Sequence, residues 1–167
     1  MITLYLDMDG VLADFNKEYT KFDPEKEDRK KFRSAVLDHN IFEKLDFMPD
    51  TQELLNHVSK LQGITVEILT SMGTHDPFQG ESAKRQKIKW LNSYNIPYKT
   101  NFVRSKEEKA QYATPTSILI DDSIGCITPF RDAGGHGIHH TNAKDTIDQL
   151  NGTLKQILTL EVLRKHS

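Results

Sequence analysis

The chain has 167 residues, a length typical of a single domain and sufficient to enclose a hydrophobic core. Its 22 lysines and arginines and 24 aspartates and glutamates give a net charge of −2, so no overall field attracts it to nucleic acid or to an anionic membrane. Because no apolar run has the length of a membrane span and the first residues lack the pattern of a signal peptide, we expect a cytoplasmic protein without a membrane partner.

Five short apolar or β-branched runs are interpreted as strands. The first, Ile2 to Leu6, stops at the acidic turn Asp7-Met8-Asp9-Gly10. The other four lie at 66–69, 101–103, 118–120 and 137–140. Stretches with helical periodicity separate them, and strands that alternate with helices predict a parallel sheet. We therefore expect a three-layer α/β/α sandwich with a Rossmann-like sheet.

Three stretches have the apolar spacing of amphipathic helices: 51–61, 81–94 and 146–163. In the second of these, the predicted buried stripe consists of Ile88, Leu91 and Tyr94. The same stretch contains four cations within six residues, namely Lys84, Arg85, Lys87 and Lys89. We interpret them as a solvated helix face. Contact with the phosphates of a polynucleotide end is the functional alternative.

Residues 15–47 do not follow the alternation of strands and helices. They contain only polar helical sequence, which predicts a small helical cap inserted within a single domain of residues 1–167. The insertion leaves the chain just after the first strand and its turn, and returns at Phe47-Met48-Pro49. It would therefore lie over the carboxyl end of that strand, where open α/β sheets bind their ligands.

Polar residues directly follow four of the predicted strands. They are Asp7 and Asp9, Thr70 and Ser71, the stretch 104–109, and Asp121 and Asp122. Because the carboxyl ends of parallel strands lie on one edge, these side chains should converge. Crowded carboxylates repel one another unless a divalent cation lies among them, and Mg²⁺ completes its shell with water and phosphate oxygens. The sequence thus predicts a magnesium site that takes a phosphate ester.

The residue types also suit phosphoryl transfer. One aspartate can attack phosphorus and form an aspartyl phosphate. A second carboxylate, Asp9, can protonate the leaving oxygen and then take a proton from the attacking water. Thr70 and a lysine would hold the remaining phosphate oxygens. A single acidic turn is usually a solvated loop, but two such turns with a hydroxyl and a lysine favour a catalytic site.

The order of these motifs resembles the haloacid dehalogenase-like phosphohydrolase superfamily. The resemblance rests on DMDGVLADF at 7–15, ILTS at 68–71, a lysine before the last acidic turn, and ILIDDS at 118–123. It implies a nucleophile at Asp7 and an acid/base at Asp9. Phosphatases and phosphomutases of the superfamily have an aspartate at the position of Asp9, whereas its dehalogenases do not, so dehalogenation is disfavoured.

The resemblance also implies the remaining site residues. Thr70 and Ser71 would bind phosphate, together with Lys109 or Lys106. Lys109 is preferred because KAQYA ahead of ILIDD is closer to the spacing of related sequences. The metal site would be formed by Asp7, Asp9, Asp121 and Asp122, with Asp122 acting through water.

Within the superfamily, the chain is similar to the 5'(3')-deoxyribonucleotidase group, which implies a small phosphorylated substrate such as a (deoxy)nucleoside monophosphate. Phe15 corresponds to a position where an aromatic ring flanks the base, and Phe47 and Met48 are candidates for the same apolar slot. A phenylalanine beside a turn is also a common core residue. A polynucleotide 3'-phosphatase, a phosphomutase and a non-enzymatic phosphate-binding or signalling module are the alternatives, although stable nucleic-acid binding is not expected.

Three further groups have simpler interpretations. His136, His139 and His140 are expected to be strand-end residues, since adjacent residues of a strand point to opposite faces and cannot share a metal. Cys126, the single cysteine, is interpreted as a small packed residue. Apolar residues of the cap, Phe32, Val36 and Leu37, would pack either on the core or on a second subunit of a homodimer.

Overall fold

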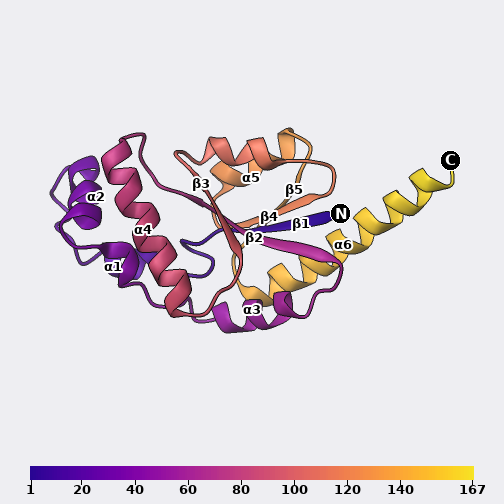
Figure 1. Ribbon diagram of the computed structural model, residues 1–167, viewed down its shortest axis with the longest axis horizontal. Helices are drawn as coiled ribbons and strands as arrows, with labels where there is room; N and C mark the ends of the chain where they lie inside the picture. Colours follow the sequence, from indigo (N-terminus) through magenta and orange to yellow (C-terminus); the bar gives the residue numbers. More distant parts are fainter.

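A five-stranded parallel sheet lies at the centre of the computed structural model, which describes residues 1–167 (Figure 1). Its strands are β1 (Ile2–Leu6), β2 (Ile64–Ser71), β3 (Lys99–Val103), β4 (Ser117–Asp121) and β5 (His136–His139). They are arranged in the order β3-β2-β1-β4-β5, and every neighbouring pair is parallel. The chain therefore reverses its direction of travel between β1 and β4. Open sheets of this kind bind ligands at that switch point.

Helices cover both faces of the sheet, as the alternating pattern predicts. They are α3 (Thr51–Ser59), α4 (Pro77–Ser93), α5 (Ile124–Asp132) and α6 (Ala143–Lys165). The apolar residues of α3, α4 and α6 join the larger core cluster, whereas those of α5 join a smaller cluster on the opposite face. All five positions of β4 are buried, because helices cover both of its sides. The predicted three-layer architecture is confirmed.

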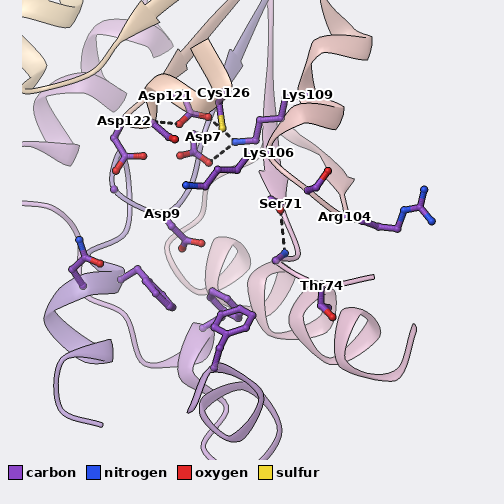
Figure 2. A pocket seen from close by; sticks show the side chains of 18 of the residues that line it. Asp7, Asp9, Ser71, Thr74, Arg104, Lys106, Lys109, Asp121, Asp122 and Cys126 are labelled. Carbon is purple, nitrogen blue, oxygen red and sulfur yellow. Dashed lines mark hydrogen bonds and ion pairs between the residues drawn. The ribbon is translucent and has the colours of Figure 1, made fainter. Parts of the chain in front are cut away.

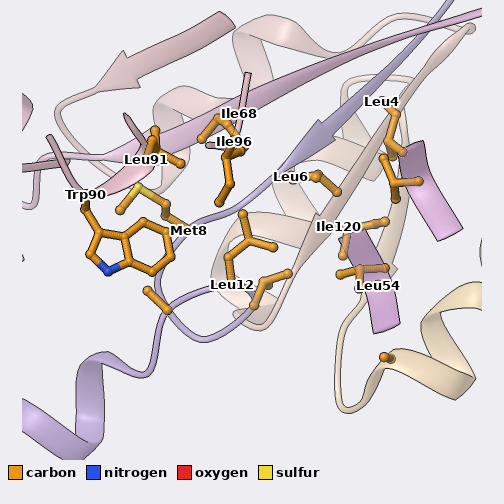
Figure 3. Packing of buried hydrophobic residues seen from close by; sticks show 14 of the residues in the cluster. Leu4, Leu6, Met8, Leu12, Leu54, Ile68, Trp90, Leu91, Ile96 and Ile120 are labelled. Atoms are coloured by element: carbon orange, nitrogen blue, oxygen red, sulfur yellow. The ribbon is translucent and has the colours of Figure 1, made fainter. Parts of the chain in front are cut away.

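The larger core cluster fixes the turn that follows β1. Figure 3 shows Met8 and Leu12 of this turn among buried residues of the sheet, with Trp90 of α4 nearby. Both Met8 and Leu12 are inaccessible to solvent. Burial of such side chains stabilises the fold by about 1.5–3 kcal/mol each, so the apolar residues of the turn hold its acidic neighbours in place.

Residues 15–47 form three short helical segments: α1 (Phe15–Tyr19), α2 (Asp28–Leu37) and the 3₁₀ helix η1 (Ile41–Glu43). A β-bridge between Ala13 and Phe47 closes the insertion at its base. The segment is fastened to α4 by polar side chains. Gln86 donates to the Val36 carbonyl oxygen at 2.8 Å, and the Trp90 indole donates to the Leu45 carbonyl oxygen at 2.8 Å.

Two of the three apolar side chains named above for the inserted segment pack within this chain. Val36 is buried in the core, and Phe32 lies against it. In Figure 1, α6 continues beyond the sheet toward the C-terminus. No helix of the structure combines the length and the apolar content needed to cross a bilayer.

Candidate active site

The turn after β1 presents two carboxylates beside the sheet. The main-chain oxygen of Met8 accepts hydrogen bonds from the N–H groups of Leu12 and Ala13, both at 2.9 Å. Met8 itself is buried, while Asp7 and Asp9, its two neighbours, line the main pocket of about 800 Å³. Burial of the Met8 side chain in the core therefore fixes the turn, and its neighbours Asp7 and Asp9 line the pocket.

Gly10 closes this turn in a backbone conformation that favours glycine. Its φ is +85°, and a Cβ atom at this position would overlap the carboxylate of Asp122. We expect Gly10→Ala to lower the free energy of unfolding by roughly 1–2 kcal/mol through left-handed strain and to displace Asp122. Thermal unfolding and Mg²⁺ titration measure the two effects. Gly63→Ala provides the control, because Gly63 has a similar φ of +71° but nothing within 4 Å of the added atom.

Three carboxylates converge at the carboxyl ends of β1 and β4. Oxygens of Asp7, Asp121 and Asp122 lie within 4.8 Å of one another. Lys109 reaches two of them, and its Nζ donates to Asp7 Oδ1 at 2.9 Å and to Asp121 Oδ2 at 2.7 Å (Figure 2). One ammonium group facing three carboxylates leaves two negative charges when all are ionised. A divalent cation neutralises this remainder, and the all-oxygen donor set is of the type that Mg²⁺ prefers.

Burial governs the charges of this cluster. Asp7 is 6% exposed. Desolvation and then the neighbouring Asp121 carboxylate raise the pKa of Asp7 well above its usual value, although Lys109 opposes the shift. Desolvation and Asp121 also raise the pKa of Asp122. Burial disfavours the charge of Lys109, but the carboxylates of Asp7 and Asp121 outweigh it and raise the pKa of this lysine. The lysine therefore stays protonated between the two carboxylates.

The two candidate phosphate lysines lie in different surroundings. The short 3₁₀ helix η2 (Glu107–Tyr112) turns Lys109 inward, where it is 2% exposed. Lys106 precedes the helix, is exposed, and lines the same pocket. Figure 2 shows the Lys106 side chain extending across the pocket toward the acidic turn. Lys109 contacts the nucleophile candidate directly, whereas Lys106 has no ion-pair partner within the protein.

A second buried lysine, Lys87 of α4, lies beside the acidic cluster. Its Nζ donates to Asp9 Oδ2 at 3.0 Å, to Thr70 Oγ1 at 2.6 Å and to the Ser71 carbonyl oxygen at 2.9 Å. Its side chain is inaccessible to solvent. The interpretation of residues 84–89 as a wholly solvated face is wrong at this position. The other three cations, Lys84, Arg85 and Lys89, do lie on the partly or fully exposed side of the helix.

The buried face of α4 also differs from the predicted stripe. Ile88 and Tyr94 are 44% and 41% exposed, so this expectation was wrong for both. The buried face instead includes Ala83, Lys87 and Leu91, which follow one another at intervals of four residues. The spacing of four residues can be found in the sequence. It does not predict a buried face, however, because one of its members, Lys87, is charged.

The carboxyl group of Asp9, which was expected at the metal site, is not one of the three clustered carboxylates. Its only hydrogen bond is the one from Lys87, and its Oδ1 is buried without a partner. Thr70, an expected phosphate ligand, is fully buried and is not among the residues that line the pocket. Its hydroxyl accepts a hydrogen bond from the same lysine. Ser71 lines the pocket, and its Oγ accepts the N–H of Gly73 at 3.0 Å. Asp9, Thr70 and Ser71 are therefore linked through a single ammonium group.

The inserted segment supplies an aromatic wall to the pocket, formed by Phe15, Phe32 and Phe42. The Phe15 ring stacks on Tyr19 with a centroid distance of 4.9 Å and on Phe42 at 5.7 Å. Met48 completes this wall.

Phe47 does not lie in the same slot as Met48, so that expectation was wrong. Its ring packs at 4.4 Å from Tyr94 and 5.7 Å from Trp90, outside the pocket. The bridge between Ala13 and Phe47 gives the two neighbours different surroundings, because successive side chains of an extended segment point in opposite directions.

Comparison with known proteins gives relatives in structure alone. No protein-family model matches the chain, and no curated protein matches it. A hydrolase from Streptococcus pneumoniae TIGR4 is similar with a TM-score of 0.58 and 16% identity, over 89% of this chain and 97% of that one. This likeness concerns the fold, and the chain shares the parallel α/β architecture of that structure.

Other structures with lower scores are also similar. D,D-heptose 1,7-bisphosphate phosphatase from Burkholderia thailandensis has a TM-score of 0.49 and 12% identity, over 89% of this chain and 85% of that one. A haloacid dehalogenase-like family protein from Streptococcus pneumoniae has a TM-score of 0.47 and 12% identity, over 89% and 90%. At these identities the likeness concerns the fold, so the roles of side chains depend on their geometry.

The three histidines near β5 each contact a different partner. His136 contacts the carbonyl oxygen of Pro115, His139 that of Asp122, and His140 contacts the hydroxyl of Thr146. Cys126 is 2% exposed, and burial raises the pKa of its thiol to about 12. Both expectations from the sequence, strand-end histidines and a packed cysteine, agree with these contacts.

Proposed function

We propose that this protein is a magnesium-dependent phosphomonoesterase that acts on a small phosphate ester, preferably a (deoxy)nucleoside monophosphate. The observation that carries the proposal is one pocket with two unlike walls. At its base lie the carboxylates of Asp7, Asp121 and Asp122 with Lys109, and on the side of the inserted segment lies the aromatic wall. A phosphate fits the first region, and a planar apolar group fits the second.

Asp7 is the nucleophile in this proposal. Its carboxylate attacks phosphorus, the bond from phosphorus to the leaving oxygen breaks, and an aspartyl phosphate forms. Asp9 gives its proton to the departing alcohol, then takes a proton from the water that attacks the aspartyl phosphate. The second attack releases inorganic phosphate and restores Asp7.

The remaining groups bind charge. Asp7, Asp121 and Asp122 would hold the magnesium ion, which supplies neutralisation of the negative charge on the phosphoryl oxygens. Lys109 uses two of its three N–H groups on Asp7 and Asp121, so one remains for a phosphoryl oxygen. Ser71 also lines the pocket, and its hydroxyl can donate a hydrogen bond to a second phosphoryl oxygen.

The cations of α4 argue against a polynucleotide substrate. Lys84 pairs with Glu81 at 3.5 Å, and Lys89 pairs with Glu43 at 3.5 Å. Acidic neighbours that partly neutralise a helix face leave little positive charge for a nucleic-acid backbone. A small substrate is therefore the better match to the pocket.

Phosphate release from a panel of esters tests the proposal. The panel contains 5'- and 3'-nucleoside monophosphates, sugar phosphates and a 3'-phosphorylated oligonucleotide, each with Mg²⁺ and with EDTA. We expect hydrolysis only with Mg²⁺, with a nucleoside monophosphate preferred. Preference for the oligonucleotide would contradict the substrate class. Turnover that requires a phosphorylated activator would indicate a phosphomutase, and stable phosphorylation of Asp7 without turnover would indicate a signalling module.

The aromatic wall gives a sharper prediction for the substrate. We expect Phe15→Ala to raise KM for a nucleoside monophosphate by about tenfold, since loss of an aromatic contact with a planar ligand costs about 1–1.5 kcal/mol. KM for glycerol phosphate, which has no ring, should stay within about twofold of the wild-type value, because only the ring contact is lost. Tyr98→Ala is a matched control, because Tyr98 lies outside this pocket. Equal changes for both esters would contradict a role of Phe15 in recognition of the base.

A further inference from the structure

We infer that Lys87 is a positioning residue, which holds the carboxyl group of Asp9 in place for proton transfer and joins it to the hydroxyl of Thr70. The inference rests on the proposed phosphatase function and adds a residue to it. Lys87 comes from the middle of α4, far in sequence from the acidic turn, and reaches the site through the core.

The contacts of Lys87 use its full donor capacity. An ammonium group has three N–H donors, and this one has three acceptors, which are provided by Asp9, Thr70 and the main chain of Ser71. No donor is left for a phosphate oxygen. Lys87 therefore differs from Lys109, and it acts on the reaction through its protein partners.

Asp9 depends on this lysine alone. The carboxyl group receives no other hydrogen bond, and its second oxygen has no partner. Without Lys87, nothing polar would fix the rotation of this side chain. A general acid must lie within hydrogen-bond reach of the leaving oxygen, so an unrestrained carboxyl group loses much of its efficiency.

The burial of Lys87 is otherwise difficult to account for. A buried ion pair is weak evidence for stability, because apolar replacements of similar volume are often neutral. The lysine also lies over the ring of Phe42, with its Nζ 4.5 Å from the ring centroid. The ammonium group of Lys87 thus contacts the acidic turn, the end of β2 and the aromatic wall of the pocket. These three parts must keep their relative positions during the reaction.

The leaving group of the substrate separates this role from a general structural one. When an alkyl phosphate reacts, its alcohol needs the proton of Asp9 as the bond to phosphorus breaks. A 4-nitrophenolate leaves as a stable anion and needs no proton. Because kcat/KM reports the steps up to departure of the leaving group, loss of acid catalysis should lower it for the alkyl ester only.

The experiment compares kcat/KM of Lys87→Met for 4-nitrophenyl phosphate and for the preferred alkyl phosphate of the panel. We expect a loss of about 100-fold for the alkyl ester and of less than about threefold for the nitrophenyl ester. Asp9→Asn should show the same selectivity. Lys89→Met, a change of an exposed lysine on the same helix, should leave both values unchanged. Rapid-quench measurement should also reveal accumulated aspartyl phosphate in Lys87→Met, because Asp9 assists its hydrolysis.

The outcomes are distinct. Equal losses for both esters in Lys87→Met, with the selective loss still present in Asp9→Asn, would overturn the inference and leave the proposed function intact. Unchanged kcat/KM values for both esters in Lys87→Met would also overturn the inference and leave the proposed function intact. If the wild-type protein hydrolyses neither ester with Mg²⁺, the proposed function fails and the inference falls with it. Lys87→Gln is a second variant for the same comparison if the methionine variant does not fold.

Discussion

Asp7→Asn should abolish magnesium-dependent phosphate release, with a fall in kcat on the order of 10⁴ or more. The amide has nearly the shape of the carboxylate but cannot form the aspartyl phosphate. It also removes one of the three oxygen ligands of the proposed metal site. The measurement is phosphate release with the preferred ester and Mg²⁺. Asp46→Asn, which changes an exposed carboxylate paired with Lys17, is the control.

The same substitution should not destabilise the protein in EDTA. The pKa of Asp7 is raised by burial and by Asp121, so between 3.8 and that raised value the folded protein holds a proton that the unfolded chain has lost. This contribution to the free energy of unfolding decreases as pH rises through the window. Asparagine does not titrate. The melting temperature of Asp7→Asn relative to that of wild type should therefore increase as the pH rises from 3.8 through the raised pKa of Asp7.

Two results would contradict this account of Asp7. Residual activity within about tenfold of wild type would remove it as the nucleophile. A melting temperature below wild type at every pH in EDTA would show that the carboxylate is a net stabilising partner of Lys109. Mg²⁺ should reverse the order of stability, because a ligand stabilises the protein according to its affinity for the folded state and wild type has the fuller donor set.

The sequence carried most of the information about the sheet, for a physical reason. Buried parallel strands need continuous apolar runs, and a run such as Ile118 to Ile120 between polar turns has few other interpretations. The ends were less certain. β2 begins at Ile64, two residues before the predicted 66. The sequence pattern missed this start because Ile64 is only partly buried and Thr65 is exposed. Helix α5 had no clear apolar stripe, and it contains Pro129.

The same distinction applies to the candidate site. Groups that follow strands, such as Asp7 and Asp121, are predictable, since topology brings strand ends together. Lys87 is not, because it comes from a helix and its burial depends on which acceptors surround the end of its side chain. The periodicity of α4 alone favours a solvated lysine. Only the three-dimensional contacts with Asp9 and Thr70 reverse that preference.

Lys109→Met should produce the second large effect, on stability as well as on catalysis. Lys109 is the sole cation in contact with Asp7 and Asp121, and all three side chains are buried. Removal of one partner from a buried ion pair costs about 3–5 kcal/mol, because the remaining charges are uncompensated. We expect a loss of this size in EDTA, measured by denaturant unfolding. Loss of a cation beside the phosphate should also reduce kcat by about 10²- to 10³-fold.

Magnesium distinguishes an electrostatic cause from a packing defect. In Lys109→Met the cluster has no ammonium group, so the divalent cation should bind more tightly and raise the melting temperature by more than it does in wild type. A packing defect would be insensitive to the ion. Lys106→Met is the matched comparison, since Lys106 lines the same pocket but is exposed and has no ion-pair partner. It should retain wild-type stability in EDTA. If Lys109→Met instead keeps its stability and activity while Lys106→Met loses activity, Lys106 is the lysine that binds phosphate.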